Sequence, residues 1–302
     1  LLHALPIYHV HGLFVACNIC FNKGIKMIFL HKFEVNQVID KLRCATVMMG
    51  VPTYFTRLLK NNNFNSSVTK NMRLFISGSA PLLSQTHNEF EKRTGHKILE
   101  RYGMSETNMN SSNPFFGERR PGTVGIPLQN ILIKITDVEN GEELEKEEIG
   151  MIEIKGDNVF KGYWCKTEET KNSFTEEGYF ITGDLGKISE DGYLTIVGRN
   201  KDLIISGGLN VYPKEIEILI DAIEGIEESA VIGIPHNDFG EAVTAIVVRK
   251  DDSQLNENKI IELTKQKLAS YKVPKAVFFV PTLPRNTMGK IQKNIIKQQF
   301  IK

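Results

Sequence analysis

The order of apolar and polar positions in the first part of the chain predicts strands and helices that alternate. Apolar runs of strand length are followed by stretches in which apolar residues recur at helical spacing. Buried strands followed by helices are typical of layered α/β architecture. The expected elements are strands at 25–30, 45–51 and 73–77, a helix at 36–43, a polar surface loop at 61–67, a Gly/Ser/Pro turn at 78–81, and a helix that ends near Arg93 with Gly95 as its cap.

The pattern changes twice farther along the chain. From about 122 to 197, short strand-like runs are separated by turn pairs such as Asn140-Gly141, which indicates a β-rich subdomain. Strand and helix patterns then return, so that a boundary at 199–202 leaves a C-terminal α+β domain of roughly 100 residues, an ordinary size. The elements expected there are a helix from Pro213 to about Ala222, strands at 229–234, 242–249 and 276–280, and helices around 260–268 and at 291–300.

Composition excludes several classes of protein. The chain has 302 residues, with 37 Lys and Arg against 36 Asp and Glu, so its net charge of +1 creates no field that attracts nucleic acid or an anionic membrane. A content of 41% hydrophobic and 24% charged residues excludes disordered and fibrous classes. No apolar run approaches the roughly 20 residues that cross a bilayer. The four cysteines are too few for a disulfide framework and are expected as reduced thiols.

Histidines and cysteines near the N-terminus allow two interpretations. His9, His11, Cys17 and Cys20 could supply zinc ligands, but the apolar residues between them lack the turns of a zinc knuckle and favour buried thiols on a helix. His9 belongs to the pattern Pro-x-x-His-x-x-Gly at an expected strand-to-helix turn, where binding residues often lie. A structural histidine is the alternative.

Two further stretches carry groups suited to a nucleotide. The small residues of Gly78-Ser79-Ala80-Pro81 let backbone and a helix N-terminus approach a planar or anionic ligand. Residues 100–107 place an aromatic ring, a hydroxyl and a carboxylate close together, and these groups suit a base, a phosphate and Mg²⁺. A polar loop around a core tyrosine is the alternative.

Three later motifs have weaker signals. Asp184 follows an apolar strand, and a carboxylate at a strand end commonly pairs with a ribose diol. Charged residues at 199–202, followed by Gly207 and Gly208, suggest a hinge at the domain junction. Lys290 lies on a loop before the last helix, where taken alone it is one of many solvated lysines.

In their fixed order, these stretches resemble the AMP-forming acyl-CoA synthetases, also called the adenylate-forming family. The resemblance covers essentially the whole chain, and residues 5–12, 100–108 and 284–290 look most like the malonyl-CoA synthetases of that family. In the family, a carboxylate attacks the α-phosphate of MgATP to give an acyl-adenylate and pyrophosphate, and CoA then displaces AMP. The resemblance implies a ligase for a short dicarboxylic acid, with malonate as the expected acid, ATP and Mg²⁺ as cofactors and CoA as co-substrate.

The resemblance also implies roles for single residues. Lys290 would be catalytic and reach between the acid and the α-phosphate, and His9 would lie close to the acyl carboxylate. Glu106 would bind Mg²⁺. Rotation of the small domain about Lys201 would present Lys290 to the site for adenylation, and Gly207 and Gly208 of the CoA channel for thioester formation. The two half-reactions would thereby be separated. The nucleotide would be bound by Ser79, Ala80, Pro81, Tyr102, Gly103, Ser105, Asp184 and Arg199.

Arg101 and Arg57 are candidate ligands for a second carboxylate. Malonate, unlike a fatty or aryl acid, brings a second negative charge into the acyl pocket, where it must be paired when it loses water. A guanidinium can bind a carboxylate through two hydrogen bonds. The alternative is that either arginine pairs with an acidic neighbour.

One family feature has no counterpart in the chain. The Ser/Thr/Gly-rich phosphate loop, which precedes the His-x-x-Gly turn in the family, is not found, and the chain opens on Leu1 in an apolar stretch. We therefore expect an incomplete large domain at 1–198, in which layered α/β structure is joined to the β-rich subdomain, a hinge at 199–202 and a small α+β domain at 203–302. A targeting segment would lie upstream, which leaves both cytoplasm and an organelle matrix open.

Two other functions stay open. A ligase for another acyl or aryl acid would have an apolar pocket with both arginines turned away. A non-catalytic fragment would bind nucleotide weakly or contact a partner, and titration with AMP or ATP would identify it. Small-molecule substrates, without nucleic acid or a membrane span, are expected for the ligases.

Overall fold

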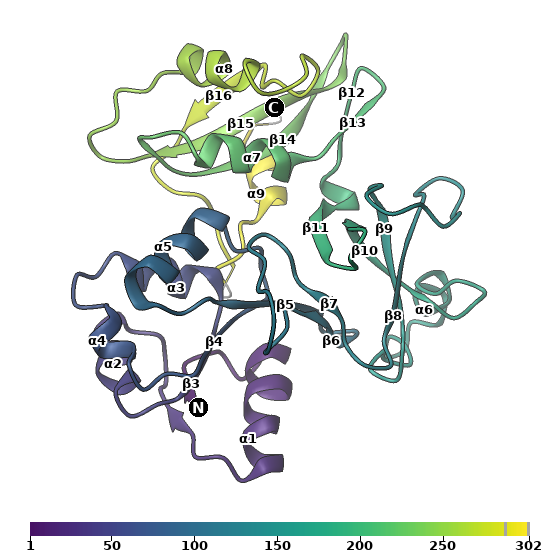
Figure 1. Ribbon diagram of the computed structural model, residues 1–302. Coiled ribbons are helices and arrows are strands. Elements are labelled where there is room, and N and C mark those ends of the chain that lie inside the picture. Colours follow the sequence, from purple (N-terminus) through teal and green to yellow (C-terminus); the bar gives the residue numbers. More distant parts are fainter. Residues whose placement is uncertain (287–288, 301–302) are drawn as a thin grey trace. The chain divides into compact units, whose positions relative to one another are not determined.

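The computed structural model describes residues 1–286 and 289–300, which form two compact units (Figure 1). The first unit comprises residues 1–182 and 186–196, and the second comprises residues 183–185 and the chain from 197 onward. Both units mix helices with strands, as the sequence predicts. No helix within the described ranges is long and apolar enough to cross a membrane.

One sheet organises the first unit. Its strands follow the order β2-β1-β3-β4-β5-β6-β7, parallel from β2 to β5 and antiparallel from β5 to β7. The carboxyl ends of the parallel strands therefore lie along one edge, which is where open α/β sheets bind ligands. The strands are β1 (Leu2–His3), β2 (Ile28–Phe29), β3 (Val47–Gly50), β4 (Leu74–Ser77), β5 (Leu99–Met104), β6 (Asn108–Ser112) and β7 (Ile126–Pro127).

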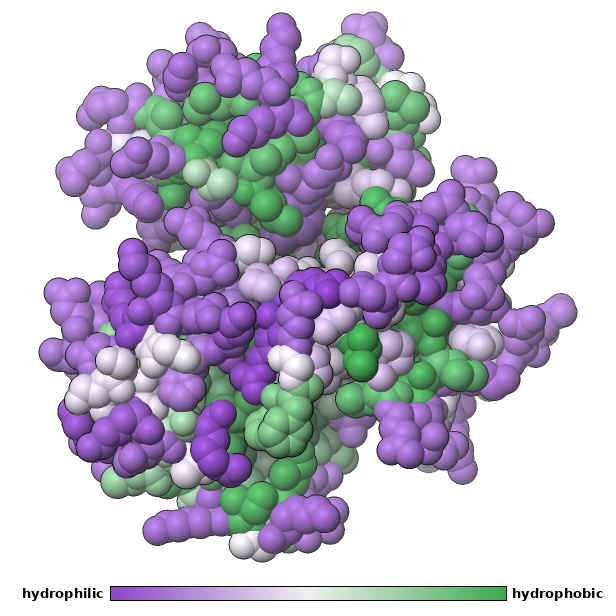
Figure 2. All heavy atoms as spheres, in the orientation of Figure 1, coloured by the Kyte–Doolittle hydropathy of each residue, from purple (hydrophilic) through white to green (hydrophobic). Residues whose placement is uncertain are grey.

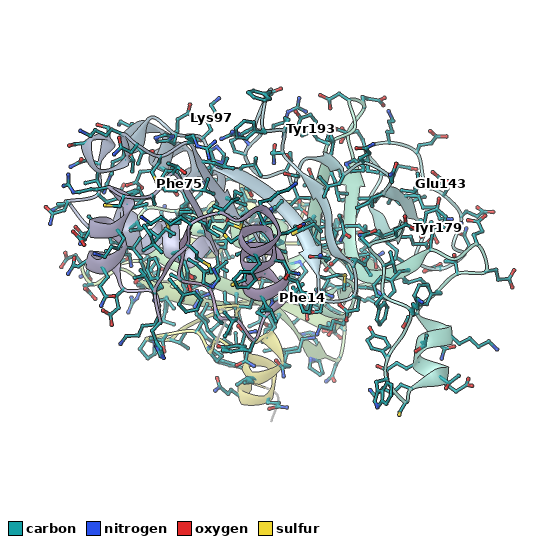
Figure 3. All side chains as sticks on the ribbon, turned by 90° about the horizontal axis from the view of Figure 1, so that it is seen from below. Phe14, Phe75, Lys97, Glu143, Tyr179 and Tyr193 are labelled. Carbon is teal, nitrogen blue, oxygen red and sulfur yellow. The ribbon has the colours of Figure 1, made fainter. Side chains whose placement is uncertain are left out.

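Helices pack on this sheet through their apolar faces. Phe90 contacts the rings of Phe55, Phe64 and Phe75, with centroids 4.9 to 5.5 Å apart, and all four side chains are fully buried. Phe75 is labelled in Figure 3. The helices are the π-helical segment η1 (His11–Cys17), α1 (Asn18–Lys23), α2 (Val35–Leu42), α3 (Pro52–Leu59), α4 (Ser66–Thr69) and α5 (Ser84–Thr94).

The expected surface loop at 61–67 is only partly a loop. The Asn65 side chain accepts hydrogen bonds from the backbone N–H groups of Ser67 and Val68 and so caps α4, which begins at Ser66. Phe64 is fully buried and holds the loop against the core. The prediction of a loop through residue 67 was wrong, because the polar run contains the cap of a helix, Asn65, and also the buried Phe64.

The β-rich part predicted at 122–197 contains a second sheet with the order β11-β10-β9-β8. Its core is formed by Ile135, Ile152, Ile154 and Leu194, and Tyr102 of β5 packs with them. The elements are β8 (Leu132–Thr136), β9 (Gly150–Lys155), α6 (Thr167–Asn172), β10 (Phe180–Ile188) and β11 (Leu194–Arg199).

The second unit is built on a sheet with the order β13-β12-β15-β14, to which β16 adds in parallel beside β15. Neighbouring residues of β14 enter different apolar clusters: Val231 packs with Ile216 of α7, whereas Ile232 packs with Ile296 of α9. Helices thus cover both faces. The elements are η2 (Asn200–Asp202), β12 (Ile204–Ser206), β13 (Leu209–Val211), α7 (Pro213–Asp221), β14 (Ile226–His236), β15 (Gly240–Arg249), α8 (Glu257–Lys265), β16 (Ala276–Phe279) and α9 (Lys293–Phe300).

The surface carries many hydrophilic side chains, and apolar side chains reach it in several places, one of them near the start of the chain (Figure 2). Figure 2 shows apolar side chains gathered over α1. Phe14 of η1, labelled in Figure 3, and Phe21 of α1 are both exposed, while Cys17 and Cys20 on the same helical segment are buried. The cysteines are therefore buried on a helix, as the apolar spacing predicts.

Candidate active site

A tight turn follows β1 and brings His9 close to the start of η1. The His9 carbonyl accepts hydrogen bonds from the backbone N–H groups of Gly12 and Leu13, both at 3.0 Å. A Cβ atom at position 12 would lie 2.1 Å from the Pro6 carbonyl oxygen, so only glycine fits. The backbone of the turn therefore requires the glycine of the pattern Pro-x-x-His-x-x-Gly, whatever the role of the histidine.

A pocket lies at the edge where the parallel strands of the first unit end. It is bounded by η1, by the turn after β4 and by the hairpin of β5 and β6, which are distant in sequence and are brought together by the parallel strand order. Its lining residues are Val10, His11, Val15, Gly78, Ser79, Arg101, Gly103, Asn108 and Met109.

His11 is the histidine that lines this pocket. Its Nδ1 shares a hydrogen bond of 3.1 Å with Ser79 Oγ, and its buried Nε2 has no hydrogen-bond partner among the described residues. Burial and, to a lesser extent, the charge of Arg101 lower the pKa of His11 to about 3, so the ring is neutral near pH 7. His9 Nδ1 accepts a hydrogen bond from the His11 backbone at 3.2 Å. Sequence reasoning selected His9 and missed His11.

Arg101 of β5 is half-buried and lines the pocket. Its Nη2 donates to Met49 Sδ at 3.2 Å, a weak acceptor, and its buried Nε has no hydrogen-bond partner among the described residues. No carboxylate of the described residues contributes to the shift in its pKa, which burial alone causes. Burial lowers the pKa of Arg101 to about 10, so the group stays charged near pH 7. A cation without a counter-ion in a pocket is suited to bind an anion.

Arg57, the other candidate for a carboxylate, has different surroundings. It is exposed in the last turn of α3 and is not among the residues that line the pocket. Its role in acid binding stays a prediction.

The turn after β4 is strained next to the pocket. Ser79 has a φ of 71°, in the left-handed region that costs a residue other than glycine about 1–3 kcal/mol. A Cβ atom at Gly78 would lie 3.3 Å from His11 Cε1, so the turn also packs closely on the imidazole. Ala80 and Pro81 continue this turn toward α5, and the structure leaves their expected contact with adenine as a prediction.

The hairpin of β5 and β6 carries the remaining nucleotide candidates of the first unit. A Cβ atom at Gly103 would lie 1.9 Å from the Asn108 carbonyl oxygen, where the register of the two strands shifts. Tyr102 is buried in the core of the β-rich part, as the alternative interpretation expects, and Ser105 is exposed. Their nucleotide contacts are untested.

Glu106 is held by the loop after β9. Tyr163 donates its hydroxyl to Glu106 Oε1 at 3.2 Å, and the Phe160 N–H donates to the Glu106 carbonyl at 2.7 Å. No group of three or more His, Cys, Asp or Glu residues within the described ranges could hold a metal ion. A single positioned carboxylate still fits Mg²⁺, which is commonly bound by one or two carboxylates together with substrate phosphates.

Asp184 and Arg199 form an ion pair in the second unit. Arg199 Nε lies 2.7 Å from Asp184 Oδ1, and Asp184 is 5% exposed. The expectation that Asp184 ends a strand was wrong, because β10 continues to Ile188. Gly183, with a φ of 71°, lies within this strand in a conformation that favours glycine.

Lys290 lies in the same unit as this ion pair. Its side chain is exposed, yet loss of surrounding water and the charge of Arg199 lower the pKa of Lys290, against the opposing effect of Asp184. Its backbone N–H donates to Asn286 Oδ1 at 3.0 Å. Thr287 and Met288 of the same motif lie outside the described residues.

The residues expected to form a hinge and a CoA channel lie on the surface of the second unit. Lys201 is exposed in η2, and Gly207 and Gly208 form the turn between β12 and β13 with φ values of 60° and 77°. Their roles stay predictions. Of the predicted site residues, Ser79, Arg101 and Gly103 line the pocket of the first unit, and Asp184, Arg199 and Lys290 lie near one another in the second. The others lie outside both groups.

Comparisons with known proteins point to one family. Residues 1–164 match the model of the AMP-binding enzymes, and residues 215–290 match the model of the C-terminal domain of AMP-binding enzymes. Over 99% of the chain, a malonate–CoA ligase from Arabidopsis thaliana is 38% identical, and a long-chain-fatty-acid–CoA ligase from Bacillus subtilis is 36% identical over 98% of the chain. The chain spans 54% and 53% of their lengths. The crystal structure of ATP-bound MatB from Rhodopseudomonas palustris is 56% identical, with a TM-score of 0.98 over 99% of this chain and 59% of that one.

Proposed function

The chain belongs to the AMP-binding enzyme family, and from this premise we propose that the full-length protein is an ATP-dependent, AMP-forming ligase that joins malonate to CoA. The observation that carries the proposal is Arg101, which lines the pocket, has a buried Nε without a hydrogen-bond partner and has no carboxylate partner among the described residues. Similarity alone does not select the acid, since malonate and long-chain-fatty-acid ligases are nearly equally identical to the chain.

The chemistry of the residues that line the pocket favours an acid with a second carboxylate. Val10, Val15 and Met109 give it apolar walls, and Arg101 supplies the positive charge. A fatty or aryl acid would leave that charge unpaired in a desolvated pocket, which is costly, whereas the distal carboxylate of malonate would pair with it. Neutral His11 adds a ring nitrogen without a partner that could hydrogen-bond the acid.

The proposed reaction has two steps. An oxygen of the proximal carboxylate attacks the α-phosphorus of ATP, and the bond to pyrophosphate breaks. The thiol of CoA, after losing its proton, then attacks the acyl carbon, and AMP leaves. Glu106 would hold Mg²⁺, which offsets phosphate charge when bound, and Lys290 would bring the two anions together in the first step.

Pyrophosphate and AMP release by the full-length protein tests this function across a panel of acids. We expect release to depend on malonate, with kcat/KM at least about 100-fold lower for acetate, octanoate and benzoate. Each acid is assayed with and without CoA, so that adenylation is separated from transfer. Equal use of octanoate or benzoate would remove the malonate assignment and favour a general acyl or aryl ligase.

A further inference from the structure

Residues 284–286 and 290–292, the second of which includes Lys290, pair as the two antiparallel arms of a hairpin in the second unit. The N–H of Gln292 donates to the Pro284 carbonyl at 2.9 Å, and the N–H of Asn286 donates to the Lys290 carbonyl at 2.9 Å. Arg285 and Ile291 form an antiparallel bridge between these bonds. The backbone of Lys290 is therefore fixed relative to both arms of the hairpin.

An ion pair at each end of the hairpin connects it to another element of the second unit. Arg285 in the first arm pairs with Glu228 of β14. Lys293, which begins α9 directly after the second arm, has its Nζ 2.5 Å from Glu217 Oε1 of α7. Lys290 thus stands between two ion pairs that tie its hairpin to different elements.

The Glu217 pair is unusually well enclosed. The side chain of Glu217 is 7% exposed and that of Lys293 is 17% exposed. Glu217 Oε1 also accepts a hydrogen bond from the Val231 N–H at 2.9 Å, and Lys214 lies 3.8 Å from Oε2. Burial alone would raise the pKa of Glu217, but the charges of Lys293 and Lys214 and the backbone hydrogen bond hold it below its usual value.

A buried ion pair of this kind adds little net stability, because the cost of removing both charges from water offsets their attraction. Fixing one geometry is a better-attested use of such a pair. Apolar packing already holds this part of the chain, since Leu283 before the hairpin and Ile296 after it are buried in one cluster. The ion pairs therefore restrict the orientation of the hairpin more closely than apolar packing alone would.

We propose that Glu217, through Lys293, and Glu228, through Arg285, are positioning residues that aim Lys290 at the reacting groups. The inference rests on the proposed function, in which Lys290 acts in the adenylation step. Misplacing a reacting group by about 1 Å can cost about 100-fold in rate. Loosening either pair should consequently slow adenylation and leave thioester formation, which does not need Lys290, unchanged.

The test compares the two half-reactions in the full-length protein. Lys293→Gln and Glu228→Gln are expected to lower kcat for malonate-dependent pyrophosphate release by roughly 10- to 100-fold, with KM values and thioester formation from supplied malonyl-adenylate within about threefold of wild type. Lys293→Arg keeps the charge and should restore most of the rate. Lys259→Gln, which removes an exposed ion pair on α8 with Glu262, is the matched control and should change neither step.

Three results would count against the proposal. Equal loss of both half-reactions in Lys293→Gln and Glu228→Gln would show a merely structural role, and an unchanged adenylation rate in both would show no role. If Lys293→Gln does not fold, the proposal is tested by Glu228→Gln alone, because the side chain of Glu228 is 26% exposed and its substitution should be better tolerated. Lys290→Ala is measured in parallel: if it keeps full adenylation, the proposed role of Lys290 fails, whereas if it loses adenylation and the pair variants do not, only this inference fails.

Discussion

Arg101→Ala in the full-length protein is expected to lower kcat/KM for malonate by about 10⁴-fold while leaving KM for ATP within about threefold. The half-buried Arg101 lines the pocket, stays charged near pH 7 and has no carboxylate partner among the described residues. Removing it would leave the distal carboxylate of malonate desolvated and unpaired, which is the condition under which a site rejects a ligand most strongly. Initial rates of pyrophosphate release against malonate concentration measure the effect.

Two further variants separate the role of the Arg101 guanidinium from a general effect of removing an arginine. Arg101→Lys keeps a charge but loses the paired donors of the guanidinium, so it should recover only part of the activity. Arg43→Ala removes an exposed arginine of the same unit and serves as the control, with no expected change. An Arg101→Ala variant that still prefers malonate to acetate as strongly as wild type would contradict the proposed role.

Lys290→Ala is expected to slow adenylation by about 1,000-fold and to spare thioester formation from supplied malonyl-adenylate. The attacking carboxylate and the α-phosphate are both anionic, so a placed ammonium group lowers the cost of bringing them together only in the first step. Pyrophosphate release measures the first step, and malonyl-CoA formation from the adenylate measures the second.

Lys265→Ala, at the exposed end of α8, removes a lysine of the same unit outside the site and is the control. Equal loss of both half-reactions in Lys290→Ala would contradict the account, because it would mean that the residue supports the fold or both steps alike.

The order of helices and strands could largely be read from the sequence because local chemistry specifies it. Pro213 begins α7, and Gly95 ends α5 in the left-handed conformation, both where backbone rules place them. The loop at 61–67 and the end of β10 could not be read this way. A buried Phe64 and a strand that passes through Gly183 depend on tertiary contacts, which a local pattern does not contain.

For the candidate site, too, some features could be predicted from the sequence and others depend on tertiary contacts. The resemblance led to Arg101, and the structure places Arg101 in the lining of a pocket. It could not show that Arg57 is exposed on α3, because helix packing decides which side chains of a helix are exposed. It also pointed to His9, whose role near the acyl carboxylate stays a prediction. The histidine that lines the pocket and shares a hydrogen bond with Ser79 is His11, and only the folded chain shows this contact.

The most direct test of the central claim is the rate of pyrophosphate release with malonate compared with malonamate, in which an uncharged amide replaces one carboxylate at nearly the same size. If Arg101 pairs with the second carboxylate, kcat/KM for malonamate should be at least about 1,000-fold lower in the full-length protein. Use of malonamate within about tenfold of malonate would contradict the claim that a charged second carboxylate is what this pocket recognises.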